Sequence, residues 1–173
     1  MGSLPRLACV DVDYRGLTAV GALFAFENWT AAVPNARLFS VRRSVAPYRS
    51  GELYRRELPS VLELLDALPE VPDIVIVDGY CWLDPEGTRP GLGGHLHEAL
   101  YRSVPVVGVA KTPHPRAHCQ DLLRGEARTP LHVSAAGLPL ERAVEGVRSM
   151  HGPFRLPTLL KGVDRACRDY VDP

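Results

Sequence analysis

Two aspartates each close a strongly apolar run of the sequence, a placement that suits metal binding. Asp11 follows residues 7–10, and Asp78 follows residues 74–77. Apolar runs without polar alternation are typical of strands buried on both faces of a parallel sheet, and ligands bind beyond the carboxyl ends of such strands. Two carboxylates meeting there would repel each other unless one is protonated or a cation lies between them. Because oxygen ligands suit hard cations, the sequence predicts a Mg²⁺ or Mn²⁺ site at this edge of the sheet.

A third acid, Glu57, is expected to face the sheet from a helix. It lies in the stretch 53–68, where apolar residues recur at helical spacing, and a helical projection places it beside Leu58. A buried carboxylate needs a cation, an arginine or a proton. Glu57 alone could equally pair with a neighbouring arginine or stabilise the start of the helix. Together with the two strand-end aspartates, it favours three acids around one metal ion.

Lys111 follows the apolar stretch 105–110 and is expected at the same edge of the sheet. An amine there could hold a phosphate or stabilise charge on a leaving oxygen. The alternative is an ordinary solvated strand end. Lysine is rare in this chain, with Lys161 the only other one, and this rarity favours a functional role for Lys111.

Hydrophobic periodicity predicts the elements that must place these residues. Strands are expected at 7–13, 17–28, 36–45, 74–78 and 105–110, with a short further candidate at 131–134. Helices are expected at 53–68, 95–102, 140–150 and 158–170, with a glycine-rich loop at 79–94 and an irregular stretch at 112–130. Since proline fits the first turn of a helix, Pro59 predicts that the regular part of the first helix begins near Leu58.

This order of elements predicts an α/β fold with the ribonuclease H-like arrangement, in which a mixed five-stranded central sheet is flanked by helices. The first and fourth strands would be neighbours, so Asp11 and Asp78 would be separated by about the ~4.8 Å spacing of adjacent strands. A chain of 173 residues suffices for one well-cored domain, and no composition shift marks a boundary. Residues 1–173 are therefore expected to form a single domain.

Composition narrows the class of protein. The formal net charge is zero, so nucleic-acid binding would depend on a local patch; the arginines within 42–56 are either such a phosphate-facing rim or a solvated surface. The four cysteines have no paired spacing, which suggests neither a disulfide framework nor a zinc knuckle. With no signal peptide and no membrane-spanning run, a soluble, cytoplasmic protein without membrane contact is expected, and a monomer is slightly favoured.

Four segments, taken in order and spacing, resemble the endonuclease V family. They are Val10-Asp11-Val12, residues 47–51 followed by Arg56-Glu57, Val77-Asp78-Gly79, and residues 104–111. The resemblance implies a ribonuclease H-like, metal-dependent endonuclease that acts on DNA or RNA containing hypoxanthine, with Mg²⁺ or Mn²⁺ as cofactor. By position, Asp11, Glu57 and Asp78 match the metal-binding acids, and Lys111 matches the active-site lysine.

The same resemblance implies a nucleic-acid-binding loop. Tyr48 matches the aromatic residue of a wedge that fills the gap left by an extruded base, and stacking there offsets part of the few kcal/mol that base flipping costs. The other expected nucleic-acid contacts are Pro47, Arg49, Gly51 and Gly79. Whether DNA or RNA is preferred stays open, because contacts to the 2′-hydroxyl decide it.

Two positions depart from the family pattern. Asp84 stands where the family has a histidine after the second aspartate, and Leu138 matches the position of a second histidine. Asp84 would either bind metal or repel the substrate. His114, His118 and His132 could replace the missing histidines, or they are loop residues without a special role.

Three functions follow as alternatives. The leading one is a metal-dependent endonuclease of the endonuclease V type, with activity that is either intact or reduced by the lost histidines. The second is a catalytically weakened homologue that binds inosine-containing or structured nucleic acid without turnover. A third, a small-molecule α/β enzyme using the same acids, is disfavoured by the loop 47–51 and the nearby arginines.

Overall fold

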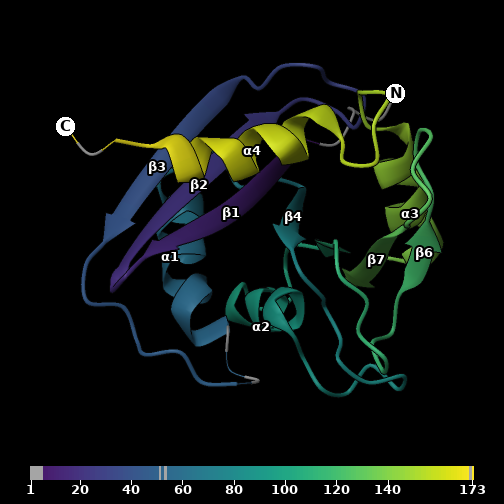
Figure 1. The fold of residues 1–173 in the computed structure, drawn as a ribbon, viewed down its shortest axis with the longest axis horizontal. Coiled ribbons are helices and arrows are strands. Elements are labelled where there is room, and N and C mark those ends of the chain that lie inside the picture. The colour runs from purple at the N-terminus through teal and green to yellow at the C-terminus, as the bar shows by residue number, and fades with distance from the viewer. Residues whose placement is uncertain (1–5, 51, 53, 172) are drawn as a thin grey trace.

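The computed structural model describes residues 6–50, 52, 54–171 and 173, which form a mixed sheet with helices on both faces (Figure 1). The strands are β1 (Leu7–Arg15), β2 (Thr18–Phe26), β3 (Ala36–Arg42), β4 (Ile74–Asp78), β5 (Val106–Ala110), β6 (Gln120–Leu122) and β7 (Leu131–Ala136). The helices are α1 (Tyr54–Asp66), α2 (Leu92–Ala99), α3 (Leu140–Ser149) and α4 (Thr158–Asp169).

The strands of the sheet are ordered β3-β2-β1-β4-β5-β7-β6. Strand β1 pairs antiparallel with β2 and parallel with β4, and β4 pairs parallel with β5. The expected hairpin and the expected neighbourhood of the first and fourth strands are therefore both present. The sheet is wider than the five strands predicted, because β7 pairs antiparallel with β5 and carries β6 at its outer edge.

Alternation along the strands divides the core between the two faces of the sheet. Leu7 and Cys9 of β1 pack with α3 and α4, whereas Ala8 and Val10 pack with α1 and α2. In Figure 1, α4 lies across β1 and β2. Each strand residue therefore belongs to one helical layer, and Asp11, which follows Cys9 by two residues, belongs to the layer of α4.

Two helices begin earlier than the sequence predicted. Helix α1 already begins at Tyr54 among the described residues, so Pro59 lies inside it and not in its first turn. A proline there cannot donate to the carbonyl of Arg55, and packing of α1 against β2 compensates for this loss. Helix α2 begins at Leu92 within the glycine run, and a Cβ at Gly93 or Gly94 would overlap the Cys81 sulfur or carbonyl oxygen.

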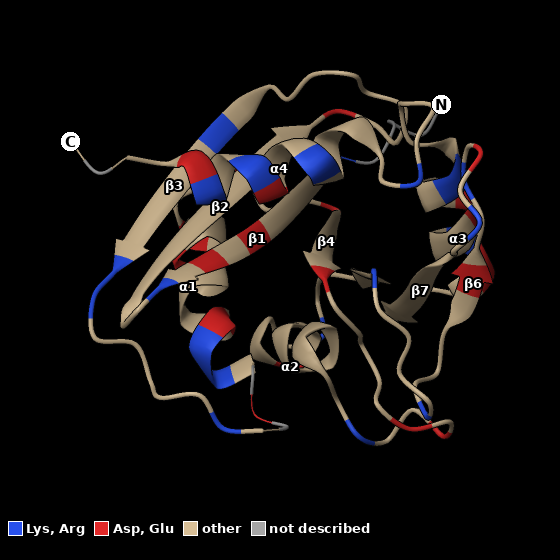
Figure 2. Ribbon diagram, in the orientation of Figure 1, with Lys and Arg blue, Asp and Glu red and all other residues tan. Residues whose placement is uncertain are grey.

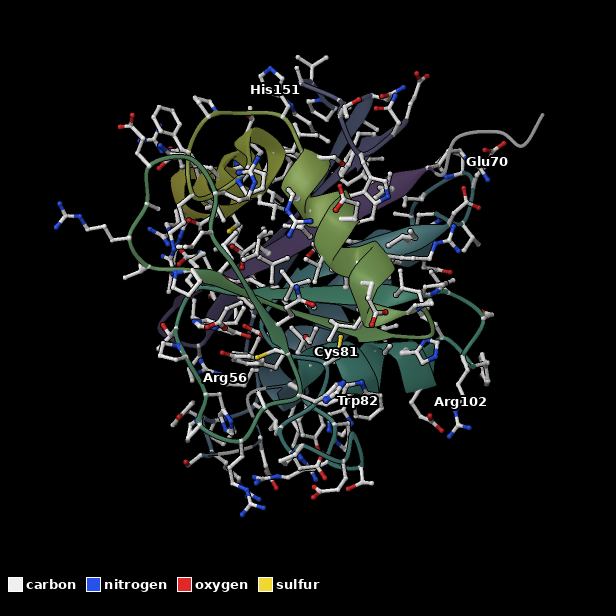
Figure 3. The ribbon with its side chains drawn as sticks, turned by 90° about the vertical axis from the view of Figure 1, so that its right-hand side faces the viewer. Arg56, Glu70, Cys81, Trp82, Arg102 and His151 are labelled. Atoms are coloured by element: carbon white, nitrogen blue, oxygen red, sulfur yellow. The ribbon has the colours of Figure 1, made fainter. Side chains whose placement is uncertain are left out.

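Close packing of α2 therefore depends on those glycines. Cys81 is buried and Trp82 is half-buried; Figure 3 shows both beside the helix. The indole nitrogen of Trp82 donates to the carbonyl of Ala135 in β7 at 2.9 Å, so this contact ties the loop after β4 to the far part of the sheet. Among the described residues, none of the helices combines the length and apolar character that crossing a lipid bilayer requires.

Candidate active site

The two aspartates occupy matching positions on neighbouring strands. In the parallel pairing of β1 with β4, Val10 is opposite Val77, and Asp11 and Asp78 follow directly. Asp78 ends β4, whereas β1 continues past Asp11 along β2. Figure 2 shows acidic segments on β1, at the end of β4, and on α1 and α4. The edge at which β4 ends is therefore the place where acids from several elements gather.

The acids of this edge interact strongly with one another. Burial raises the pKa of Asp11 to about 8, with further contributions from the charge of Asp78 and a hydrogen bond with Asp164. Burial also raises the pKa of Glu57 to about 8, and the charges of Asp11 and Asp78 add to this effect. The charge of Arg56 lowers the pKa of Glu57 but does not outweigh these effects. Its guanidinium lies over the Tyr14 ring, 4.1 Å from the ring centre. Asp11, Glu57 and Asp78 therefore lie close enough for the negative charge of one to disfavour ionisation of another.

Lys111 lies among these carboxylates, as expected for a residue after β5. Its Nζ atom is 3.2 Å from Asp78 Oδ2 and 3.7 Å from Asp164 Oδ2. Burial lowers the pKa of Lys111, but the charges of Asp78 and Asp164 outweigh this effect and raise it above its ordinary value. The ammonium group is therefore a fixed positive charge at this site.

Asp164 is a fourth acid that the sequence reasoning missed. It lies on α4 with its side chain 17% exposed, and its Oδ1 also accepts from Arg168 Nη2 at 2.9 Å. A signal was present in the sequence: Leu160 and Val163 precede it at helical spacing, so Asp164 interrupts the apolar face of an amphipathic helix. Such an acid is directed toward the sheet.

Two cavities share Asp78. A cavity of about 20 Å³, lined by Asp11, Asp78 and Lys111 together with apolar residues of β4 and α4, has room for one ion or water, which needs roughly 10–15 Å³. A second cavity of about 170 Å³ is lined by Glu57 and Asp78 and by the segment after β4. Its lining residues are Tyr54, Glu57, Asp78, Gly79, Tyr80, Leu83, Pro90, Gly91 and Leu92.

The acids fit a hard divalent cation by their donor chemistry. They offer carboxylate oxygens, the ligands that Mg²⁺ and Mn²⁺ prefer. The raised pKa values of Asp11 and Glu57 arise from burial and like charge, and a cation would relieve both effects. The residues present therefore fit the metal that the sequence predicted.

A buried arginine holds the loop 150–155, which lies beside Lys111. Arg124 is 7% exposed, and its guanidinium donates to carbonyls of the loop 150–155, including Met150 at 2.6 Å and Phe154 at 2.6 Å. From this loop, Arg155 Nη2 donates to the carbonyl of Lys111 at 2.7 Å. The backbone on which Lys111 stands is thus held from a distant segment of the chain.

The resulting groove lies next to the acids and is mainly basic. It has a volume of about 850 Å³ and includes both Lys111 and Asp164 in its lining. The remaining lining residues are Glu126, Ala127, Pro153, Phe154, Arg155, Leu156, Lys161, Arg165 and Arg168. Its charge is suited to a polyanion that reaches the acids from the side of α4.

Comparison with known proteins identifies the family. The family model of endonuclease V matches residues 3–143, more than half of the chain of 173 residues. The chain belongs to the endonuclease V family. Endonuclease V of Thermus thermophilus is 33% identical over 187 residues, which cover 90% of this chain and 78% of that relative. The resemblance drawn from the four sequence segments is thus confirmed.

Solved structures of the endonuclease V family show the same fold. That of Streptomyces avermitilis has a TM-score of 0.78 at 27% identity and covers 96% of this chain and 81% of its own. Endonuclease V of Ciona intestinalis, solved with a 24mer DNA containing an inosine followed by a ribo-adenosine, has a TM-score of 0.78 at 17% identity. The match covers 95% of this chain and 85% of that protein's chain. The expected ribonuclease H-like α/β fold is confirmed.

The two departures from the endonuclease V pattern have structural explanations. Asp84 holds its own loop, because its carboxylate accepts from the backbone N–H of Thr88 at 2.8 Å and of Arg89 at 2.9 Å and from the Thr88 hydroxyl. These hydrogen bonds, first that of Arg89, lower the pKa of Asp84. Leu138 follows β7 at the end where Ala136 pairs with Val106, the start of β5. Leu138 therefore lies beyond the end of β5 opposite to Lys111, away from the acids of the candidate site.

The predicted nucleic-acid loop lies at the surface. Pro47, Tyr48 and Arg49 are all exposed, with Tyr48 63% exposed, and Gly51 lies outside the described residues. Gly79 directly follows Asp78 with φ of +132°, a conformation that favours glycine, and turns the chain into the second cavity.

Not every arginine of the stretch 42–56 points toward a ligand. Arg42 Nη1 lies 2.9 Å from Glu63 Oε2, and Arg55 Nε lies 3.3 Å from Glu52 Oε2. These two side chains therefore form local ion pairs at the surface.

Proposed function

We propose that this chain is a metal-dependent endonuclease that hydrolyses a phosphodiester bond near deoxyinosine or inosine in nucleic acid. The observation that carries the proposal is the cluster of buried acids with Lys111 at one edge of a ribonuclease H-like sheet. Membership of the endonuclease V family supports the reaction class, and the inosine-containing DNA bound by the Ciona intestinalis protein supports the substrate class.

Asp11, Glu57 and Asp78 would hold Mg²⁺ or Mn²⁺, with Asp164 as a further acid close to Asp11. A bound divalent cation would supply positive charge to the scissile phosphate and the leaving oxygen. The protein contributes the fixed arrangement, because two of the acids follow paired strand residues and the other two are directed inward from α1 and α4.

Lys111 would stabilise negative charge that develops on the phosphate. Its ammonium group is held by Asp78 and Asp164, and the Arg155 side chain fixes the Lys111 carbonyl. A preorganised cation in a partly buried site stabilises a transition state without reorganising during the reaction. Removing one such donor costs on the order of 10²–10³ in rate.

The second cavity is the proposed site for the extruded base. It adjoins Asp78 and Glu57, and its walls include the Tyr80 ring and the backbone around Gly79. The exposed Tyr48 would fill the gap left in the duplex, and the basic groove beside α4 would accept the phosphate backbone.

Cleavage assays with paired substrates test this proposal. The protein is incubated with a deoxyinosine duplex and with an inosine-containing RNA, each with Mg²⁺ or Mn²⁺ and with chelator, beside the variant Asp78→Ala. Metal-dependent cutting near the modified base that Asp78→Ala abolishes is the expected result. Retained binding without cutting would favour the weakened homologue, and neither binding nor cutting would reject the proposal.

A further inference from the structure

A second group of metal-ligating side chains lies on β6 and β7, at the edge of the sheet farthest from β3 (Figure 1). Asp121 is paired with His132 across these antiparallel strands, so both side chains project from the same face. Cys119 lies directly before β6 and two residues before Asp121, with its sulfur close to the other two side chains. One ligand atom from each of the three residues lies within 4.8 Å of the other two.

We propose that Cys119, Asp121 and His132 form a zinc site. A thiolate, an imidazole and a carboxylate are the ligand types that zinc accepts, whereas Mg²⁺ and Mn²⁺ prefer oxygen alone. Three protein ligands would leave the fourth tetrahedral position to water. The site is separate from the acids of the proposed nuclease centre and does not depend on the nuclease proposal.

The ligand atoms would have to shift by up to about 1 Å to surround the ion. His132 Nδ1 lies 2.7 Å from Asp121 Oδ1, whereas ligand atoms around tetrahedral zinc are separated by roughly 3.3–3.8 Å, given bonds of about 2.0–2.3 Å. His132 is held in place, since its side chain is 8% exposed, but the Asp121 side chain is 66% exposed and free to move outward. The buried imidazole provides the rigid ligand and the exposed carboxylate the adjustable one.

Two other interpretations of this cluster are weaker. A nucleophilic or redox-active cysteine needs a lowered pKa, but burial and the charge of Asp121 raise the pKa of Cys119. A simple hydrogen-bonded pair of His132 and Asp121 would explain those two residues but would leave the placement of Cys119 without a reason. Zinc accounts for all three.

Zinc binding would stabilise β6 at the outer edge of the sheet. Strand β6 has only three residues, and the ion would tie it to β7. His132 is opposite Ala110 of β5, directly before Lys111, and its ring centre lies 6.4 Å from that of Tyr80. The zinc site would therefore support the strand beside Lys111 and one wall of the second cavity.

Cobalt and zinc binding to the full chain test the proposal. Metal-free protein, carrying Asp78→Asn to weaken binding at the acids, is titrated with Co²⁺ and then with Zn²⁺. We expect one equivalent of Co²⁺ to produce a thiolate-to-cobalt charge-transfer band that Zn²⁺ displaces. Cys119→Ser should abolish the band, and His132→Gln should weaken zinc binding by ~10–100-fold or more. Cys81→Ser, at a buried thiol outside the cluster, should change neither.

Thermal unfolding separates loss of the site from loss of the fold. Zinc should raise the Tm of the protein but not that of the Cys119→Ser variant, while the two metal-free proteins should have similar Tm values. A band that persists in Cys119→Ser, or less than a tenth of an equivalent of zinc bound by the protein with intact Cys119, would overturn the proposal. Either result would leave the nuclease proposal unaffected.

Discussion

The ammonium group of Lys111 lies 3.2 Å from a carboxylate oxygen of Asp78. Both residues follow apolar stretches that pair as parallel neighbours in β4 and β5, so the contact is fixed by the register of the sheet. In the metal-free protein, Lys111 offsets part of the negative charge of the acids. A divalent ion at the acids would take over that role and leave the lysine to interact with a phosphate.

Replacing Lys111 by methionine should reduce cleavage more than it reduces binding. We expect the single-turnover rate on a deoxyinosine duplex to fall by about 10²–10³, because a preorganised charge is removed. The matched control is Lys161→Met, since Lys161 lies in the basic groove and contacts the Phe154 ring but is not paired with the acids. An equal loss of rate in both variants would show that Lys111 acts only through general charge.

Asp11→Asn should stabilise the metal-free protein while abolishing cleavage. Asparagine keeps the acceptor for the Val12 N–H, which lies 2.8 Å from Asp11 Oδ1, but removes a charge that burial and neighbouring acids disfavour. We expect the free energy of unfolding at pH 8.5 in chelator to rise by a few kcal/mol, because a carboxyl with a raised folded-state pKa reduces stability once it is ionised. Thermal unfolding measures this change, and a lowered Tm in the variant would contradict the electrostatic account.

The pH dependence of stability follows from the same shifts. The pKa values of Asp11 and Glu57 are about 8 in the folded protein but 3.8 and 4.5 ordinarily, so the folded state binds more protons between those values. These groups therefore reduce the stability of the metal-free protein progressively as the pH rises from about 4 to about 8. The Tm in chelator should fall over this range, and Asp11→Asn should make the fall smaller. An unchanged slope in the variant would refute this assignment.

Asp164→Asn should lower cleavage although no sequence motif marks this residue. Asparagine retains an acceptor for Arg168 but removes the charge beside Lys111 and Asp11. We expect the cleavage rate at limiting Mg²⁺ to fall by about tenfold or more, as for loss of an orienting group near a metal. Asp169→Asn, at an exposed position at the end of the same helix, is the control and should retain full activity.

Tyr48→Ala should impair action on duplex substrate, whereas Tyr48→Phe should preserve it. Stacking of an aromatic ring on nucleic acid contributes about 1–3 kcal/mol, so the dissociation constant for a deoxyinosine duplex should rise about tenfold in the alanine variant. A single-stranded substrate has no gap to fill and should show a smaller change. Equal effects on both substrates would argue against a wedge.

The centre of the sheet was predictable from the sequence, because its signals are local and strong. Apolar runs without alternation predicted β1, β4 and β5, and the acids that follow them predicted the edge at which carboxylates gather in the structure. Strand β6 gave no such signal, since Gln120-Asp121-Leu122 is short and mostly polar. Only its pairing with β7 makes it a strand.

Tertiary packing decided the features that the sequence did not reveal. Asp164 becomes a site residue because α4 crosses β1, a contact between segments far apart in the chain. The sequence after Asp84, with Pro85 and Thr88, is typical of a turn stabilised by an aspartate side chain. The family pattern, by contrast, identifies Asp84 only as the replacement of a histidine. Leu138 lies beside the start of β5 because β7 runs antiparallel to β5, and no local sequence pattern specifies the direction of β7.

Calorimetric titration of the metal-free protein with Mn²⁺ measures whether Asp11, Glu57 and Asp78 jointly bind one divalent cation. We expect one Mn²⁺ to bind, with an affinity at least tenfold lower in each of Asp11→Asn, Glu57→Gln and Asp78→Asn. The affinity should be unchanged in the control Asp84→Asn, because the Asp84 carboxylate is bonded within its own loop. Absence of Mn²⁺ binding, or binding that all three substitutions leave intact, would contradict the account.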